Sequence, residues 1–236
     1  MSETAIGTIG LIALFVLLAL RMPVAMTMLI VGFFGTIAIN GLTAALSSLG
    51  GEAFEIASTS MLIVVPLFVL MGNLAGVSGM SRDLYDAAYA WVGHHRGGLA
   101  SATIGGCAGF AALSGSSIAS AVTMGRVALP QMKRFNYDDS LATGAVAAGG
   151  TLGILIPPST GMIIYGILTE QSIGRLFMAG VFPGLLLTGL FLVAIYIVTR
   201  IRPEAGPPGP RVNMRERFAA ARRSLVIVGI VLATIG

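Results

Sequence analysis

Two short interruptions concentrate polar chemistry within the apolar stretch from 105 to 166. The first reads Leu113-Ser114-Gly115-Ser116-Ser117 and the second reads Gly153-Ile154-Leu155-Ile156-Pro157-Pro158-Ser159. Both place hydroxyls and helix-breaking residues where a lipid anchor would carry Leu and Val. Backbone that leaves helical geometry at membrane depth is tolerated only when protein buries it or a watery cavity solvates it. Two such breaks predict a site for a polar solute or an ion.

The composition indicates an integral membrane protein. The chain is 56% hydrophobic and 10% charged, with a mean hydropathy of +0.91, whereas soluble domains carry about 25% charged residues. The net charge of +4 does not indicate nucleic-acid binding, because the basic residues lie between apolar runs. The single cysteine, Cys107, excludes an internal disulfide and a cysteine-based metal cluster. The N-terminal residues lack a basic segment and a cleavage site, so we expect no cleaved signal peptide.

Uncharged windows define the expected helices before the first break, since a crossing needs about 20 apolar residues. We expect helices at 4–20 and 23–39, an external loop or short surface helix at 40–58, and a third span at 59–77 kinked at Pro66. Residues 81–96 place Leu84, Ala87, Ala88 and Trp91 at helical spacing. They predict an interfacial amphipathic arm, with Tyr85, Tyr89 and Trp91 in the headgroup zone.

The distribution of positive charge favours a hairpin over a single overlong helix at 97–125. Seven of the fourteen Lys and Arg residues fall between Arg200 and Arg223, which predicts a cytoplasmic loop. Counting back through crossings at 176–199 and 140–169 makes Arg126 cytoplasmic. A hairpin that returns to its starting face then keeps Arg96 cytoplasmic and the N-terminus outside, whereas a single crossing would not. We therefore predict a re-entrant hairpin over 97–132.

The rest of the chain is expected to contain one broken crossing, one plain crossing and a linker. Two consecutive prolines interrupt 140–169, since each lacks a donor and restricts the residue before it. A Pro- and Gly-rich linker at 203–210 leads to a basic amphipathic helix at about 212–223. A further uncharged run starts at Ser224, which suggests the first part of a longer protein.

Several motifs in register resemble one family. They are Pro66-Leu67-Phe68, Arg96-Gly97-Gly98-Leu99-Ala100, Ser114-Gly115-Ser116-Ser117, Gly153 to Ser159 with Tyr165-Gly166, and Ala179-Gly180-Val181-Phe182-Pro183-Gly184. Together they resemble the N-terminal half of the large membrane subunit of tripartite ATP-independent periplasmic (TRAP) transporters, of the dicarboxylate-permease type. The second half of the family pattern is absent, and the family often has Asp or Thr where Ser120 stands.

The resemblance implies an all-α polytopic protein of the bacterial inner membrane. It would be the first of two inverted repeats, with a re-entrant helical hairpin and a broken helix, and with its N-terminus periplasmic. The family imports organic anions with a sodium gradient by an elevator mechanism. Its partners are a periplasmic solute-binding protein and a small four-helix membrane subunit. The expected organisation is scaffold helices and arm (1–96), transport domain (97–169), membrane helix (170–199), cytoplasmic basic linker (200–223) and the start of the second half (224–236).

The two breaks suit a sodium ion and an anion. Sodium takes hard oxygen ligands, which free carbonyls and hydroxyls supply, and no other metal or cofactor is expected. The candidate ion-binding residues are Ser114, Gly115, Ser116, Ser117, Thr151, Gly153, Pro157 and Ser159. A helix N-terminus after the first break would face a carboxylate, with Ser116, Ser117 and Pro158 as substrate-binding candidates. The alternative is that these small residues only permit close helix packing.

Two rival functions remain open. A non-transporting membrane scaffold subunit would have the same helices. An intramembrane serine hydrolase is disfavoured, because a serine nucleophile needs a base within hydrogen-bond reach and no His, Asp or Glu lies inside an apolar span. The absence of a phosphate-binding Gly-Lys loop argues against direct ATP use. We therefore expect a transporter subunit rather than an enzyme, in contact with membrane lipid and without a nucleic-acid partner, whose anion the sequence does not identify.

Overall fold

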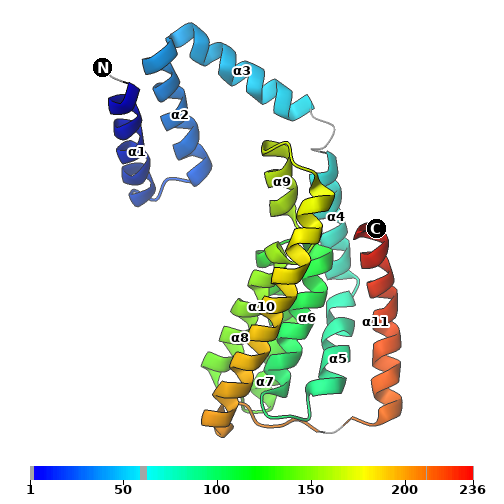
Figure 1. Ribbon diagram of the computed structural model, residues 1–236. Coiled ribbons are helices and arrows are strands. Elements are labelled where there is room, and N and C mark those ends of the chain that lie inside the picture. Colours follow the sequence, from blue (N-terminus) through cyan, green and yellow to red (C-terminus); the bar gives the residue numbers. More distant parts are fainter. Residues whose placement is uncertain (1–2, 59–62, 211, 236) are drawn as a thin grey trace. The chain divides into compact units, whose positions relative to one another are not determined.

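The computed structural model describes residues 3–58, 63–210 and 212–235, and these form helices, turns and loops without a β-strand. The chain divides into two compact units, Met1–Leu62 and Ile63–Gly236. Figure 1 labels the helices of both. The first unit holds α1 (Glu3–Ala19), α2 (Val24–Asn40) and α3 (Leu42–Ser58). The second holds α4 (Val64–Val77), α5 (Met80–Val92), α6 (Gly98–Ser114), α7 (Ser117–Arg134), α8 (Asp139–Leu155), α9 (Thr160–Leu168), α10 (Ile173–Ile201), the 3₁₀ turn η2 (Pro203–Ala205) and α11 (Met214–Ile235).

In the first unit, α1 and α2 form an antiparallel pair joined by a tight turn in which Arg21 adopts a positive φ of 64°. Much of their apolar surface is exposed within the unit: Phe15 is 62% and Phe34 64% accessible. Exposed apolar helix surface on this scale is expected where lipid replaces water. The predicted helices at 4–20 and 23–39 are confirmed. The stretch 40–58 forms a full helix, α3, rather than a loop.

The core of the second unit lies where α6, α7 and α8 pack together. Phe110, Met124 and Leu152 are almost completely inaccessible there. Glycines let these backbones approach closely, as is common between membrane helices. A Cβ added to Gly149 would lie 2.7 Å from Cys107 Sγ, and one on Gly150 would lie 2.7 Å from Ala121 Cβ. The hairpin α6–α7 and the helix α8 therefore form one tightly packed body.

Two segments of the described chain are long and apolar enough to cross a bilayer. They are Asp139–Leu168, which comprises α8 and α9, and Ile173–Ile201, which is α10. Shorter apolar helices include Val24–Asn40 and Gly98–Ser114. The long α10 shows many exposed apolar side chains, such as Phe182 at 74%. These lengths and surfaces agree with a polytopic membrane protein.

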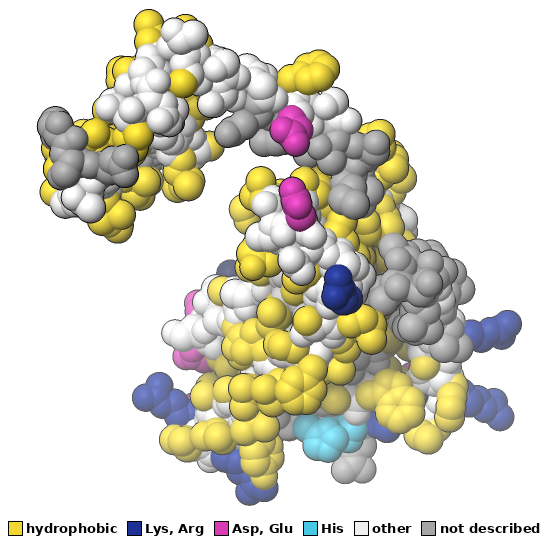
Figure 2. All heavy atoms as spheres, turned by 45° about the horizontal axis from the view of Figure 1, so that its top comes forward, with side chains coloured by type: hydrophobic (Ala, Val, Ile, Leu, Met, Phe, Trp, Pro, Cys, Tyr) yellow, Lys and Arg dark blue, Asp and Glu magenta, His cyan; other side chains and the backbone are white. Residues whose placement is uncertain are grey.

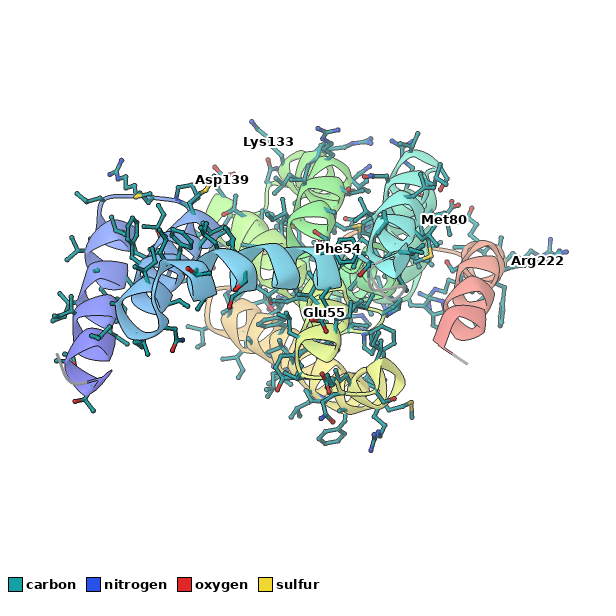
Figure 3. The ribbon with its side chains drawn as sticks, turned by 90° about the horizontal axis from the view of Figure 1, so that it is seen from above. Phe54, Glu55, Met80, Lys133, Asp139 and Arg222 are labelled. Carbon is teal, nitrogen blue, oxygen red and sulfur yellow. The ribbon has the colours of Figure 1, made fainter. Side chains whose placement is uncertain are left out.

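Basic residues gather at one end of the second unit. Figure 1 shows the α5–α6, α7–α8 and α10–α11 connections at this end. Figure 3 shows Lys133 and Asp139 close together, at the end of α7 and the start of α8, and Arg222 pointing away from the unit on α11. Three backbone hydrogen bonds hold the linker after α10 along this end. Gly97 N–H donates to Gly206 O at 2.8 Å, Asp138 N–H donates to Ala205 O at 3.0 Å, and Gly209 N–H donates to Gly93 O at 2.9 Å.

Pro66 is the third residue of α4. The segment before it, 59–62, lies outside the described residues, so the kink within 59–77 stays a prediction. Two predicted details are wrong. Tyr85 does not face the headgroup zone, because it is buried against α6 at 2% exposure, whereas Trp91 is 46% exposed as expected. The basic helix does not stop near 223, because α11 continues without interruption to Ile235. The start of the predicted third span, 59–62, lies outside the described residues.

Candidate functional site

The first break is the tip of a helical hairpin. Helix α6 ends at Ser114, and Gly115 follows in the left-handed region at φ 57°, which glycine adopts without the Cβ clash of other residues. Ser116 is extended and caps α7, since its Oγ accepts from Ala119 N–H at 3.4 Å. The predicted hairpin is therefore confirmed as helix–turn–helix geometry; that it is re-entrant in a bilayer stays a prediction.

The second break separates α8 from α9. Helix α8 ends at Leu155, and Ile156 turns to extended geometry before the two prolines. Neither proline can donate to a preceding carbonyl, so the helix stops where the sequence predicts. Ser159 is also extended and caps α9, with its Oγ accepting from Met162 N–H at 3.5 Å. Each break is thus followed by a serine-capped helix N-terminus.

The two breaks lie against each other. Gly115 O accepts from Thr160 Oγ1 at 2.8 Å and from Thr160 N–H at 3.3 Å. A Cβ on Gly115 would lie 2.9 Å from Pro158 O, and one on Gly153 would lie 2.5 Å from Ser116 O. The C-terminal ends of α6 and α8 therefore meet the N-terminal ends of α9 and α7. The carbonyls at helix C-termini attract cations, and the amides at helix N-termini attract anions. Both kinds of group therefore lie within one small volume.

The predicted site residues divide into those at this contact and one away from it. Ser114 is buried with its Oγ 2.8 Å from Ser120 Oγ, and Ser117 Oγ is buried without a hydrogen-bond partner. Thr151 is exposed, and its Oγ donates to Ala148 O at 2.6 Å. The residues that the structure brings to the contact are Ser114, Gly115, Ser116, Ser117, Gly153, Pro157, Pro158 and Ser159.

Thr160 is absent from the predicted set and makes the only side-chain hydrogen bond recorded between the two breaks in the described residues. The sequence could have indicated Thr160, because it follows a serine N-cap directly. A hydroxyl in the first turn of a helix can reach a neighbouring segment. Ser120 is likewise fully buried beside Ser114. It lies one helical turn past the cap, where its side chain turns back toward the break.

The geometry does not support serine hydrolysis. The histidines His94 and His95 precede α6, while Ser114 is its last residue. A helix of 17 residues is about 25 Å long, which is far beyond the hydrogen-bond reach that an activated serine requires.

Comparison with known proteins identifies a family. The family model described as "Tripartite ATP-independent periplasmic transporter, DctM component" matches residues 11–236. A C4-dicarboxylate TRAP transporter large permease protein of Pseudomonas aeruginosa is 47% identical over 178 residues, which are 75% of this chain and 41% of that protein. An ectoine TRAP transporter large permease protein of Halomonas elongata is 38% identical over 175 residues, 74% of this chain and 40% of the relative.

A sialic acid TRAP transporter permease protein of Haemophilus influenzae is 33% identical over 173 residues, which cover 71% of this chain and 28% of the relative. The chain thus spans well under two thirds of the length of these relatives. The named relatives are transporter permeases rather than enzymes. Together with the matched helices and breaks, these likenesses show that the chain belongs to the DctM component family, the large permease subunits of TRAP transporters.

Proposed function

We propose that this chain forms the first half of the large permease subunit of a sodium-coupled transporter that imports organic carboxylates. The observation that carries the proposal is the meeting of four helix ends at the two breaks. Thr160 and Gly115 join them through two hydrogen bonds. Broken helices that meet in this way provide carbonyls for a coupling ion and amides for an anionic solute.

The sodium ion would lie on the carbonyl side of this contact. The last turn of α6 ends in main-chain carbonyls that lack an intrahelical partner, and the Ser114 and Ser120 hydroxyls lie beside that end. Ser159 adds a fully buried hydroxyl from the second break. A hydroxyl oxygen that accepts one long capping bond retains a second lone pair, so Ser116 and Ser159 can cap their helices and still face a cation.

The carboxylate would lie on the amide side. The first turns of α7 and α9 direct N–H groups toward the breaks, and their dipoles favour negative charge. The buried, unpaired Ser117 Oγ is a ready donor there. Three relatives are named for a C4-dicarboxylate, ectoine and sialic acid, each of which contains a carboxylate. A further relative is named for isethionate, whose acidic group is a sulfonate. Both groups are anions of the kind that these amides would recognise.

The close packing of α6, α7 and α8 supports an elevator in which the hairpin and the broken helix move as one transport body. The glycine contacts at Gly149 and Gly150 leave little room for relative sliding. A periplasmic solute-binding protein would deliver the anion, and a small four-helix membrane subunit would complete the complex in the bacterial inner membrane. The N-terminus would be periplasmic, and the basic end of the second unit cytoplasmic.

The test is solute uptake into proteoliposomes by the full-length permease with both partners. Ser116→Ala and Ser159→Ala should each raise the sodium concentration for half-maximal uptake several-fold, as expected for losing one ligand worth about 0.5–1.5 kcal/mol. Thr143→Ala is the matched control, because it removes an exposed hydroxyl of α8.

Ser116→Thr is the conservative rescue variant, since threonine retains both the hydroxyl and the cap. It should restore most of the sodium affinity that Ser116→Ala loses. Uptake that needs no sodium in the wild type, or sodium dependence unchanged in both alanine variants, would contradict the proposed site. A chain that assembles with its partners but supports no uptake would instead identify a scaffold subunit.

A further inference from the structure

A second candidate site lies at the basic end of the second unit, away from the two breaks. It is a cavity of about 550 Å³ between the start of α6 and the end of α10. Its polar end carries Arg96, Arg200, His95 and Ser101, and its apolar side includes Leu192 and Tyr196. None of its nine lining residues is acidic. We propose that this cavity binds the phosphate headgroup of an anionic glycerophospholipid, a site beyond the proposed transport function.

The fold holds the two arginines together although they are distant in sequence. Gly97 adopts a positive φ of 72° and its N–H donates to Gly206 O at 2.8 Å. A Cβ on Gly97 would lie 2.8 Å from Ile195 Cγ2 and 2.9 Å from Thr199 Cγ2. The turn that carries Arg96 therefore packs directly on the last two turns of α10, next to Arg200.

The electrostatics of the cavity favour an anion. Neither Arg96 nor Arg200 has an ion-pair partner among the described residues. The Arg200 guanidinium lies 5.1 Å from the centroid of the Tyr196 ring, a cation–π contact that orients it and leaves its N–H edge available. The N-terminal turn of the 17-residue α6 lies beside them and adds partial positive charge. Two guanidinium groups suit a phosphate.

The surroundings distinguish a lipid from a free phosphate. Leu192, Tyr196 and Arg200 follow one another at four-residue spacing on one face of α10, so they pass from apolar to aromatic to cationic over about 12 Å. The polarity of a phospholipid changes in the same order from its acyl chain to its headgroup. Tyr196 is 56% and Leu192 37% exposed, so this face is open. Figure 2 shows histidine side chains beside hydrophobic ones at the end that carries Lys and Arg.

The position agrees with the proposed topology. Basic pockets between membrane helices on the cytoplasmic side bind anionic headgroups. This cavity lies at the end of the second unit where Lys133, Arg134 and Arg202 also lie, near the turns that join α5 to α6 and α7 to α8. A lipid bound here would contact both the hairpin and α10.

The test is native mass spectrometry of the full-length permease with its small membrane subunit, titrated with phosphatidylglycerol, phosphatidylcholine or inorganic phosphate. The wild type should retain one phosphatidylglycerol at least about tenfold more tightly than phosphatidylcholine. Arg96→Gln and Arg200→Gln should each weaken phosphatidylglycerol binding about tenfold, because each removes a charge-assisted contact. Arg202→Gln is the matched control, since it changes a neighbouring arginine that lines a different cavity.

Leu192→Ser should weaken phosphatidylglycerol binding while leaving any phosphate binding unchanged, because it alters only the acyl-chain side. Equal lipid retention in the wild type and the Arg96→Gln/Arg200→Gln double variant would overturn the proposal, as would an equal loss in Arg202→Gln. Displacement of the lipid by millimolar inorganic phosphate would assign the site to a free anion. A cross-link from a cysteine at Tyr196 to another polypeptide, unaffected by added lipid, would assign the surface to a protein partner.

Discussion

Replacing Gly153 by alanine tests directly whether the two breaks are held in contact. The glycine lies in the last turn of α8, and an added Cβ would meet three backbone atoms of the hairpin tip: Ser116 O at 2.5 Å, Ser116 C at 2.6 Å and Ser117 N at 2.8 Å. None of these atoms belongs to a flexible side chain. The tip must therefore move by at least about 0.5 Å before the shortest of these contacts becomes tolerable.

The expected energies follow from two opposing terms. Steric overpacking costs about 1–3 kcal/mol, whereas glycine-to-alanine replacement inside a helix contributes up to about 1 kcal/mol of stability. Gly144→Ala is the matched control, because Gly144 is in the same helix and its Cβ would meet nothing within 4 Å. Gly144→Ala should gain only the stability that alanine contributes inside a helix. The free energies of unfolding of the two variants should consequently differ by the cost of the steric clash, about 1–3 kcal/mol.

The assays are thermal unfolding of the purified full-length permease and sodium-dependent uptake in proteoliposomes. Gly153→Ala should unfold at a lower temperature than Gly144→Ala. It should also need more sodium, because ion-binding groups must be held within about 0.5 Å of their working geometry. Equal stability and equal sodium dependence in the two variants would refute the contact between the tip and α8.

Three further predictions address topology, pH and the linker. A cysteine replacing the exposed Arg126 on α7 should react with membrane-impermeant reagents only from the cytoplasmic side, and periplasmic labelling would reject the re-entrant hairpin. Burial raises the pKa of Tyr137 to about 12, although its hydroxyl accepts from Leu99 N–H at 3.1 Å. The protonated Tyr137 side chain therefore contributes fully to folding stability below pH 10, and this contribution is lost as the pH rises toward 12. Tyr137→Phe should reduce the loss of unfolding temperature across that window, and an unchanged slope would assign the alkaline loss to other groups. Gly206→Ala would place a Cβ 3.1 Å from Gly97 N and Cα, so it should destabilise the basic end by about 1–3 kcal/mol, whereas Gly189→Ala, with nothing within 4 Å, should not.

The sequence by itself determined most of the helices and the position of the two breaks. Consecutive prolines lack N–H donors, so the interruption at Pro157-Pro158 follows from covalent structure. A glycine between serines predicts the turn at Gly115 for the same local reason, since glycine adopts positive φ and serine caps a following helix. The composition determined the membrane class, because charged side chains are costly in lipid and are therefore rare in membrane-spanning segments.

The tertiary structure alone decided which of these groups meet. Nothing local to the sequence places Thr160 on Gly115 O or turns Thr151 outward, because both depend on the rotation of α8 and α9 against the hairpin. Tyr85 looked interfacial from its spacing but is buried, since helix periodicity reports an apolar face and not what covers it. Likewise, Arg96 and Arg200 share one cavity only because Gly97 packs on α10. Contacts between distant segments depend on packing over the whole unit, whereas helix breaks depend on a few neighbouring residues.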